Sequence, residues 1–251
     1  QKTAYEISLG LVGSEMCIRD RIRFIWYNET SSENVKLSYW IEYWNSTSQE
    51  ATVWVKIPFL ENNTVTRIYL YYGNPSAQSE SNPKETMFIY ENYSTRPEGS
   101  LAGSATYDSV NEWVQLTPNS NDEIGYLYYT KVPTNPIGFY AKFYFWAGGG
   151  NGADAVWLGA YDSSYSGTRE DVVNGGYHFT YDEYQDRIAF TKSTSDNGAS
   201  ICEASETGID DANWHDAEIY FWRDSSGAHA KIYYDGALRV DCTDTSPQSL
   251  C

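Results

Sequence analysis

The sequence predicts an all-β protein. Aromatic residues make up 16% of the chain, including 23 Tyr and 9 Trp, and aromatic residues favour strands. Apolar and polar residues alternate in many short runs, which is the pattern of a strand with one buried face. Polar loops separate the runs, and no stretch has the periodicity of a long helix. We therefore expect a β-sandwich or jelly roll.

The first residues are interpreted as translated sequencing adapter and not as native protein. QKTAYE (residues 1–6) and LVGSEMCIRD (residues 11–20) back-translate, in one frame and in the right order, into the constant blocks of an adapter oligonucleotide. Residues 7–10 then fall at its variable index. Scars of this kind are excluded from fold reasoning, so residues 1–21 are set aside. The native start is then missing, and we expect membrane attachment only through missing parts of the chain.

Net charge narrows the classes of partner. The chain carries a formal charge of −17 at pH 7, whereas nucleic acids and anionic membrane surfaces are bound through basic patches. We therefore expect no nucleic-acid partner. The acidic balance is compatible with cations and with neutral sugars.

Two features favour an extracytoplasmic location. N-x-Ser/Thr sequons begin at Asn28, Asn45, Asn62 and Asn92. A disulfide between Cys202 and Cys242 would fit the same compartment, and the alternative is that both are small buried thiols. We expect an extracellular or cell-surface protein.

Residues 22–90 are expected to form a small β-rich module. Strand-like runs occupy residues 22–27, 39–44, 52–58 and 66–73. Residues 81–88 are expected to begin one helical turn, because Asn82 can cap it and Pro83 suits the first helical position.

The same module resembles a known family. The segments YWIEYW, ATVWVKIPFL and RIYLYYGNPSAQSESN are similar to domain-of-unknown-function family 2341, which occurs in surface and secreted proteins, many of them archaeal. The resemblance implies a β-rich accessory module and brings no catalytic residues with it.

Residues 91–104 are polar and are expected to separate this module from a second β series. The strand candidates of that series are residues 112–118, 125–132, 138–147, 154–161, 216–223 and 230–241. The last of these contains Asp235-Gly236, a pair suited to a tight hairpin turn.

The second series, residues 99–251, resembles the L-type lectins. The resemblance rests on VQLTPNSNDEIGYLYY, FYAKFYFWAGGGNGADAVWL, GGYHFTYDEYQDRIAF, and WHDAEIYFW followed by AKIYYDGALRVDCTD. It implies a concanavalin A-like jelly-roll sandwich, here possibly truncated at its C-terminal end. Together the two parts resemble archaeal surface proteins.

A candidate metal site lies in GGYHFTYDEYQDRIAF (residues 175–190). Asp182 and Asp186 stand four residues apart where a strand should end, and short-spaced oxygen ligands can hold a hard cation. The alternative is a solvated strand end. The lectin resemblance implies calcium binding through Asp182, the Tyr184 carbonyl and Asp186, where Asp186 replaces the family's Asn. Thr180 stands where the family has Glu, which implies loss of the family's transition-metal site. Thr191 falls near the position of the family's second aspartate, so the calcium site is incomplete unless a loop shift brings another acid in.

The resemblance also implies a carbohydrate site. Asp154, within Ala153-Asp154-Ala155, would accept hydrogen bonds from sugar hydroxyls. The glycine-rich loop at residues 148–152, including Gly149 and Gly150, would donate backbone N–H groups, and Asp186 would add a polar contact. The aromatic residues expected near this site, as candidates for stacking on a sugar, are Trp157, Tyr161, Tyr165 and Tyr177.

No catalytic motif is recognised. Glucanases that share this sandwich carry Glu-x-Asp-x-x-Glu on one strand, and the sequence lacks it. His178, His215 and His229 follow no nucleophile-elbow or zinc-binding spacing. The sequence therefore predicts a non-catalytic carbohydrate-binding module. The alternative is a structural or adhesive cell-surface module that does not bind sugar.

Overall fold

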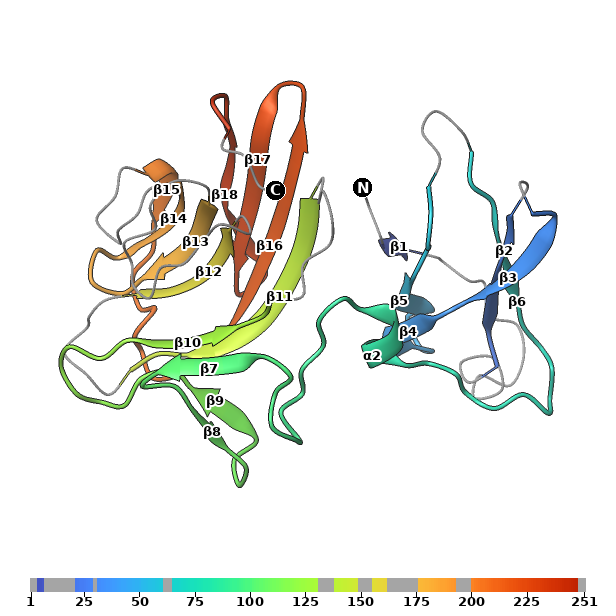
Figure 1. Cartoon of the computed structure of the whole chain (residues 1–251), viewed down its shortest axis with the longest axis horizontal. Helices are drawn as coiled ribbons and strands as arrows, with labels where there is room; N and C mark the ends of the chain where they lie inside the picture. The colour runs from blue at the N-terminus through green and yellow to red at the C-terminus, as the bar shows by residue number, and fades with distance from the viewer. Residues whose placement is uncertain are drawn as a thin grey trace. The chain divides into compact units, whose positions relative to one another are not determined.

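The computed structural model describes residues 4–6, 21–28, 31–60, 65–130, 138–148, 155–161, 176–192 and 200–247. With 55% strand and 2% helix, the fold is all-β, as predicted. The chain forms two compact units, one ending at Asn92 and the other beginning at Tyr93, and both are drawn in Figure 1. Within the described ranges, no helix is long and apolar enough to cross a membrane.

The N-terminal unit contains two three-stranded antiparallel sheets. One has the order β1 (Ala4–Glu6), β5 (Glu50–Val55), β4 (Tyr39–Asn45). The other has the order β3 (Glu33–Leu37), β2 (Arg23–Asn28), β6 (Ile68–Tyr71). Their shared core consists of Ile22, Phe24, Leu37, Tyr39, Ala51, Val53 and Val55. β1 lies within the segment interpreted as adapter, and it pairs with β5 at the edge of its sheet.

The predicted helical turn is confirmed as α2 (Pro83–Thr86). The Asn82 side chain accepts a hydrogen bond from the Glu85 backbone N–H at 3.3 Å, and Pro83 occupies the start of the helix. The cap satisfies a donor that has no partner within the helix.

Two small sheets begin the second unit. β7 (Ser100–Gly103) pairs with β10 (Gly125–Tyr128), and β8 (Thr106–Asp108) pairs with β9 (Trp113–Gln115). The boundary between the two units falls within the predicted boundary segment, residues 91–104, and that segment also contains β7, which was not among the predicted strands. Leu101 of this strand lies opposite Leu127 of β10, so a partner distant in sequence makes the strand.

The two largest sheets are four-stranded and antiparallel (Figure 1). The first has the order β11 (Gly138–Trp146), β16 (Trp214–Asp224), β17 (Gly227–Tyr234), β18 (Ala237–Asp244). The second has the order β12 (Ala155–Tyr161), β13 (Gly176–Asp182), β14 (Arg187–Thr191), β15 (Ser200–Ser205).

Aromatic side chains from the inner faces of the two sheets make a common core. The ring centroids of Phe145 and Tyr181 lie 5.1 Å apart, and those of Tyr177 and Phe221 lie 5.2 Å apart. Tyr144, between two inward residues of β11, is 64% exposed. The alternation predicted for residues 138–147 is therefore confirmed, and the sheets pack as a sandwich.

The predicted turn at Asp235-Gly236 is also confirmed. Both residues have positive φ, 48° and 75°, and the turn joins β17 to β18.

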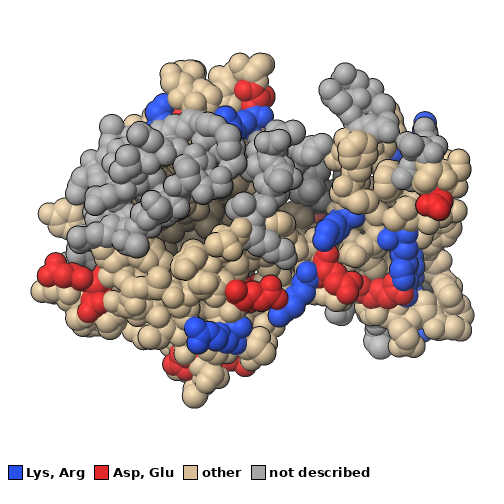
Figure 2. All heavy atoms as spheres, in the orientation of Figure 1, with Lys and Arg blue, Asp and Glu red and all other residues tan. Residues whose placement is uncertain are grey.

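On the face drawn in Figure 2 most of the described surface is uncharged, and most Lys and Arg side chains lie near Asp or Glu side chains.

Candidate functional site

The predicted sugar loop is only partly described. Gly149, Gly150 and Asp154 lie outside the described residues. Gly148 has φ +150°, and a Cβ there would come within 2.8 Å of the Ala212 Cα. The Ala212 N–H donates a hydrogen bond to the Ala147 carbonyl at 3.0 Å. Position 148 therefore requires glycine, and the end of β11 is tied to the segment that precedes β16.

Strand register brings the start of β12 and the turn between β13 and β14 to one edge of the sheet. Ala155, which follows Asp154 in the chain, is the partner of Asp182 in the β12–β13 pair. Asp182 is also the last residue of β13 and pairs with Arg187, the first residue of β14. The start of β12 therefore lies beside the β13–β14 turn, which carries Tyr184 and Asp186.

Both carboxylate oxygens of Asp182 accept hydrogen bonds from protein groups. It is 2% exposed. One carboxylate oxygen, Oδ2, accepts from Arg187 Nε at 3.0 Å, and the other, Oδ1, accepts from the Gln185 N–H at 2.9 Å. Charge-assisted hydrogen bonds of this kind are strong. Arg187 therefore supplies the positive charge that the lectin resemblance assigned to a metal ion.

The other predicted calcium ligands do not complete a metal centre. Tyr184 is 68% exposed, and Asp186 is an exposed turn residue with φ 50°. The Asp186 carbonyl accepts a hydrogen bond from the Glu206 N–H at 2.8 Å. Among the described residues, no three His, Cys, Asp or Glu side chains are grouped to hold a metal. The described side chains do not fit a calcium site that needs six to eight oxygens.

Two residues that the lectin resemblance placed at metal-ligand positions, Thr180 and Thr191, are buried. Thr180 is 4% exposed and Thr191 2% exposed. Thr191 lies opposite His178, which is 5% exposed. Burial lowers the pKa of His178 to about 4, because desolvation disfavours the charged imidazolium.

The aromatic candidates for stacking on a sugar that the structure describes lie in different environments. Tyr177 is fully buried in the sandwich core, so it belongs to the core and is not available to stack on a sugar. The Tyr161 hydroxyl oxygen lies 2.7 Å from Nε2 of His178. The Trp157 ring stacks on the same imidazole, with 6.0 Å between the ring centroids. Both side chains are half-buried. Tyr165 lies outside the described residues.

His215 links the β17–β18 turn to the segment that precedes β16. It is 5% exposed, with Nδ1 2.9 Å from Asp235 and Nε2 3.0 Å from Asp211. Its ring stacks on Tyr234 at 4.8 Å. The contacts join the β17–β18 turn to the segment before β16, so His215 has a positioning role there.

His229 belongs to a Ser–His–Asp group that the sequence reading did not find. Its Nε2 lies 3.0 Å from both Ser226 Oγ and Asp224 Oδ1, and its Nδ1 lies 2.8 Å from Thr243 Oγ1. In a serine-hydrolase triad the carboxylate and the serine occupy opposite nitrogens of the imidazole. Here they share one nitrogen, which is not the arrangement that activates a serine nucleophile.

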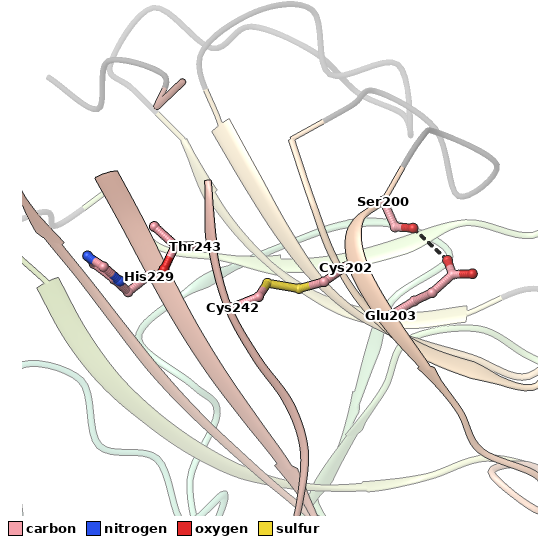
Figure 3. Close-up of a disulfide and its surroundings, with 6 residues drawn as sticks. All are labelled: Ser200, Cys202, Glu203, His229, Cys242 and Thr243. Atoms are coloured by element: carbon pink, nitrogen blue, oxygen red, sulfur yellow. Dashed lines mark hydrogen bonds between the residues drawn. A yellow bond between two sulfur atoms is a disulfide. The ribbon is translucent and has the colours of Figure 1, made fainter. Parts of the chain in front are cut away.

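Cys202 and Cys242 form a disulfide, which resolves the alternatives left by the sequence. Figure 3 shows the bond running from Cys202 to Cys242, with the Ser200–Glu203 hydrogen bond nearby. Cys202 lies on β15 and Cys242 on β18, the edge strands of the two four-stranded sheets. The disulfide therefore joins one sheet to the other.

Sequence reasoning also missed a group of exposed tryptophans, Trp113, Trp146 and Trp214, which we call the tryptophan cluster. Trp146 and Trp214 are directly opposite each other on β11 and β16. Trp113, on β9, has its ring centroid 5.7 Å from that of Trp214. Alternation in residues 138–147 already placed Trp146 on the outer face, but its partners come from strands distant in sequence.

Comparison with known protein families finds a match for only part of the chain. Residues 19–115 match a family described as a domain of unknown function (DUF2341). The match extends past the end of the N-terminal unit and stops before β11, so it includes neither four-stranded sheet. No curated protein and no solved structure matches the chain.

Proposed function

We propose that the chain is a non-catalytic carbohydrate-binding module. The observation that carries the proposal is the pairing of Ala155 with Asp182, which sets the chain that follows Asp154 beside the turn that carries Asp186. In this proposal Asp154 accepts hydrogen bonds from sugar hydroxyls, Gly149 and Gly150 donate backbone N–H groups, and Asp186 adds a polar contact. A few convergent polar groups beside aromatic surface are typical of small-molecule sites.

We place the protein at a cell surface or outside the cell. The Cys202–Cys242 disulfide supports this location, because disulfides persist in oxidising compartments. The sequons agree with it, and Asn92 lies on the exposed surface.

The loop geometry in this proposal does not depend on calcium. Arg187 holds Asp182, and the Asp186 carbonyl is fixed by the Glu206 N–H, so protein groups shape the turn. Calcium binding would use Asp182, Tyr184 and Asp186 only if Arg187 moved away. Chelation tests calcium binding directly, because a ligand that binds only the native state raises the stability of the native state.

The proposal is tested by glycan-array screening followed by calorimetry with Asp154→Asn. We expect the intact chain to bind a glycan and the variant to lose roughly tenfold or more in affinity, as when one partner of a desolvated polar contact is removed. Asp241→Asn is the matched control, since Asp241, on β18, is an exposed carboxylate paired with Lys231 of β17. Equal affinities for the intact chain and Asp154→Asn would refute the site assignment.

The second candidate is a structural or adhesive module that does not bind sugar. The ion pair between Asp182 and Arg187 favours it, because this predicted ligand is engaged in holding the fold. Binding to a cell-surface protein by the intact chain, with no glycan bound on the array, would support this candidate over carbohydrate binding.

A further inference from the structure

The tryptophan cluster is the most exposed indole surface in the described part of the chain. Trp113 is 37% exposed, Trp146 45% and Trp214 54%, and the other described tryptophans are half-buried or buried. Three strands that are distant in sequence contribute one residue each. Large aromatic side chains are strongly favoured in cores, so their collection on the surface points to contact with a ligand.

The cluster adjoins the predicted sugar loop through described backbone. Trp146 is followed by Ala147 and Gly148, the point where the glycine-rich loop begins. The Ala147 carbonyl accepts a hydrogen bond from the Ala212 N–H at 3.0 Å, and Ala212 lies two residues before Trp214. The ends of both tryptophan-bearing strands are thus held beside the start of the loop.

Charge around the cluster selects the class of ligand. On the same face of the sheet, the pair next to Trp146 and Trp214 is Tyr144 and Asp216. The one nearby cation on the outer face of β11, Lys142, is already 3.2 Å from Asp216 and 3.3 Å from Glu218. With a chain charge of −17, an anionic ligand would meet repulsion here. A neutral sugar would not, and carboxylates can accept its hydroxyl hydrogen bonds.

We propose that Trp113, Trp146 and Trp214 form a stacking platform for a neutral polysaccharide. The indole faces would contact the apolar faces of successive pyranose rings. This inference rests on the proposed function and adds to it the aromatic contact and the substrate class. It commits to a polysaccharide, because indoles from separate strands offer contacts to more than one ring.

The test uses the full chain with Trp214→Ala and the double variant Trp113→Ala/Trp214→Ala. Trp222→Ala is the matched control, because Trp222 lies on the outer face of the same strand but stacks on His229 at 4.8 Å, away from the cluster. The probes are soluble laminarin, dextran and mannan as neutral polysaccharides and alginate as an anionic one. Affinity is measured by calorimetry, and a thermal melt confirms that each variant is folded.

We expect at least one neutral polysaccharide to bind, with affinity reduced roughly tenfold or more in Trp214→Ala and further in the double variant, as for tryptophan contacts that carry binding energy. Trp222→Ala should bind like the intact chain, and alginate should not bind. Equal affinity in all variants would overturn the inference, as would binding of alginate alone. Concentration-dependent dimerisation abolished by Trp214→Ala, with no glycan bound, would show instead that the cluster joins two copies of the chain.

Asp154→Asn separates the two proposals. If that variant loses glycan binding while the double tryptophan variant keeps it, the proposed function stands and the platform is refuted. If the tryptophan variants lose binding while Asp154→Asn keeps it, the platform stands and the loop assignment fails. If the intact chain binds no glycan, both fail.

Discussion

Removal of the Cys202–Cys242 disulfide should strongly destabilise the sandwich. The bond closes a loop of sequence separation 40 between the edge strands β15 and β18. In the chain-entropy account, cross-linking a loop of this length removes unfolded-state entropy worth about 4 kcal/mol at 25 °C. For a unit of this size, that loss should lower the thermal midpoint by roughly 10 °C.

The assay is urea and thermal unfolding of Cys202→Ala/Cys242→Ala, followed by far-ultraviolet circular dichroism. Alanine is chosen because both cysteines pack against the apolar core, where a serine hydroxyl would lack a partner. The matched control is Cys17→Ala/Cys251→Ala, which leaves the disulfide intact and should unfold like the intact chain. Reductant should destabilise the control and leave the disulfide-free variant unchanged. The reasoning is refuted if the disulfide-free variant is within about 1 kcal/mol of the intact chain, because the entropy term alone exceeds that value.

Three further outcomes follow from the contacts. Because burial lowers the pKa of His178 to about 4 from 6.5, the unfolded chain binds the proton first as pH falls. The stabilising term is therefore present above pH 6.5 and is lost towards pH 4, costing about 2.5 kcal/mol at pH 4.5. Urea unfolding at pH 7 and pH 4.5 should show that part of the loss missing in His178→Gln, and an identical pH dependence in both proteins would contradict it. Arg187→Met should cost about 3 kcal/mol in urea unfolding, because it leaves the buried Asp182 carboxylate unpaired, whereas Lys231→Met, which breaks an exposed pair with Asp241, should cost less than 1 kcal/mol. Chelation of the intact chain should leave the thermal midpoint unchanged, and a fall would instead support calcium. Deletion of residues 1–21, keeping the buried Ile22, should leave the midpoint of the N-terminal unit unchanged because β1 only extends a sheet edge, and loss of its cooperative unfolding would show that the segment belongs to the fold.

Local patterns in the sequence predicted most of the sandwich. The alternation of Phe143 and Phe145 with Tyr144 identified β11 because a strand with one buried face needs only its own residues to show the pattern. Asp235-Gly236 identified its hairpin for a similar reason, since the positive φ values are a property of the turn itself. Asn82 and Pro83 likewise identified the short helix from a local capping rule.

Features that depend on distant partners could not be predicted in the same way. β7 has no marked alternation, and its pairing with β10 places Leu101 opposite Leu127. The Asp182–Arg187 pair lies within the predicted metal segment, yet the family resemblance drew attention to the carboxylates and not to Arg187, the first residue of β14. The tryptophan cluster needs the β9 hairpin to meet β16, a tertiary contact that no single stretch of sequence contains.

Binding of the intact chain to neutral polysaccharides, measured by calorimetry beside Asp154→Asn and Trp113→Ala/Trp214→Ala, tests the central claim most directly. The account predicts saturable binding by the intact chain and losses of roughly tenfold or more in each variant. A folded intact chain that binds none of the neutral polysaccharides would contradict it and would leave the structural or adhesive module as the function supported by the sandwich.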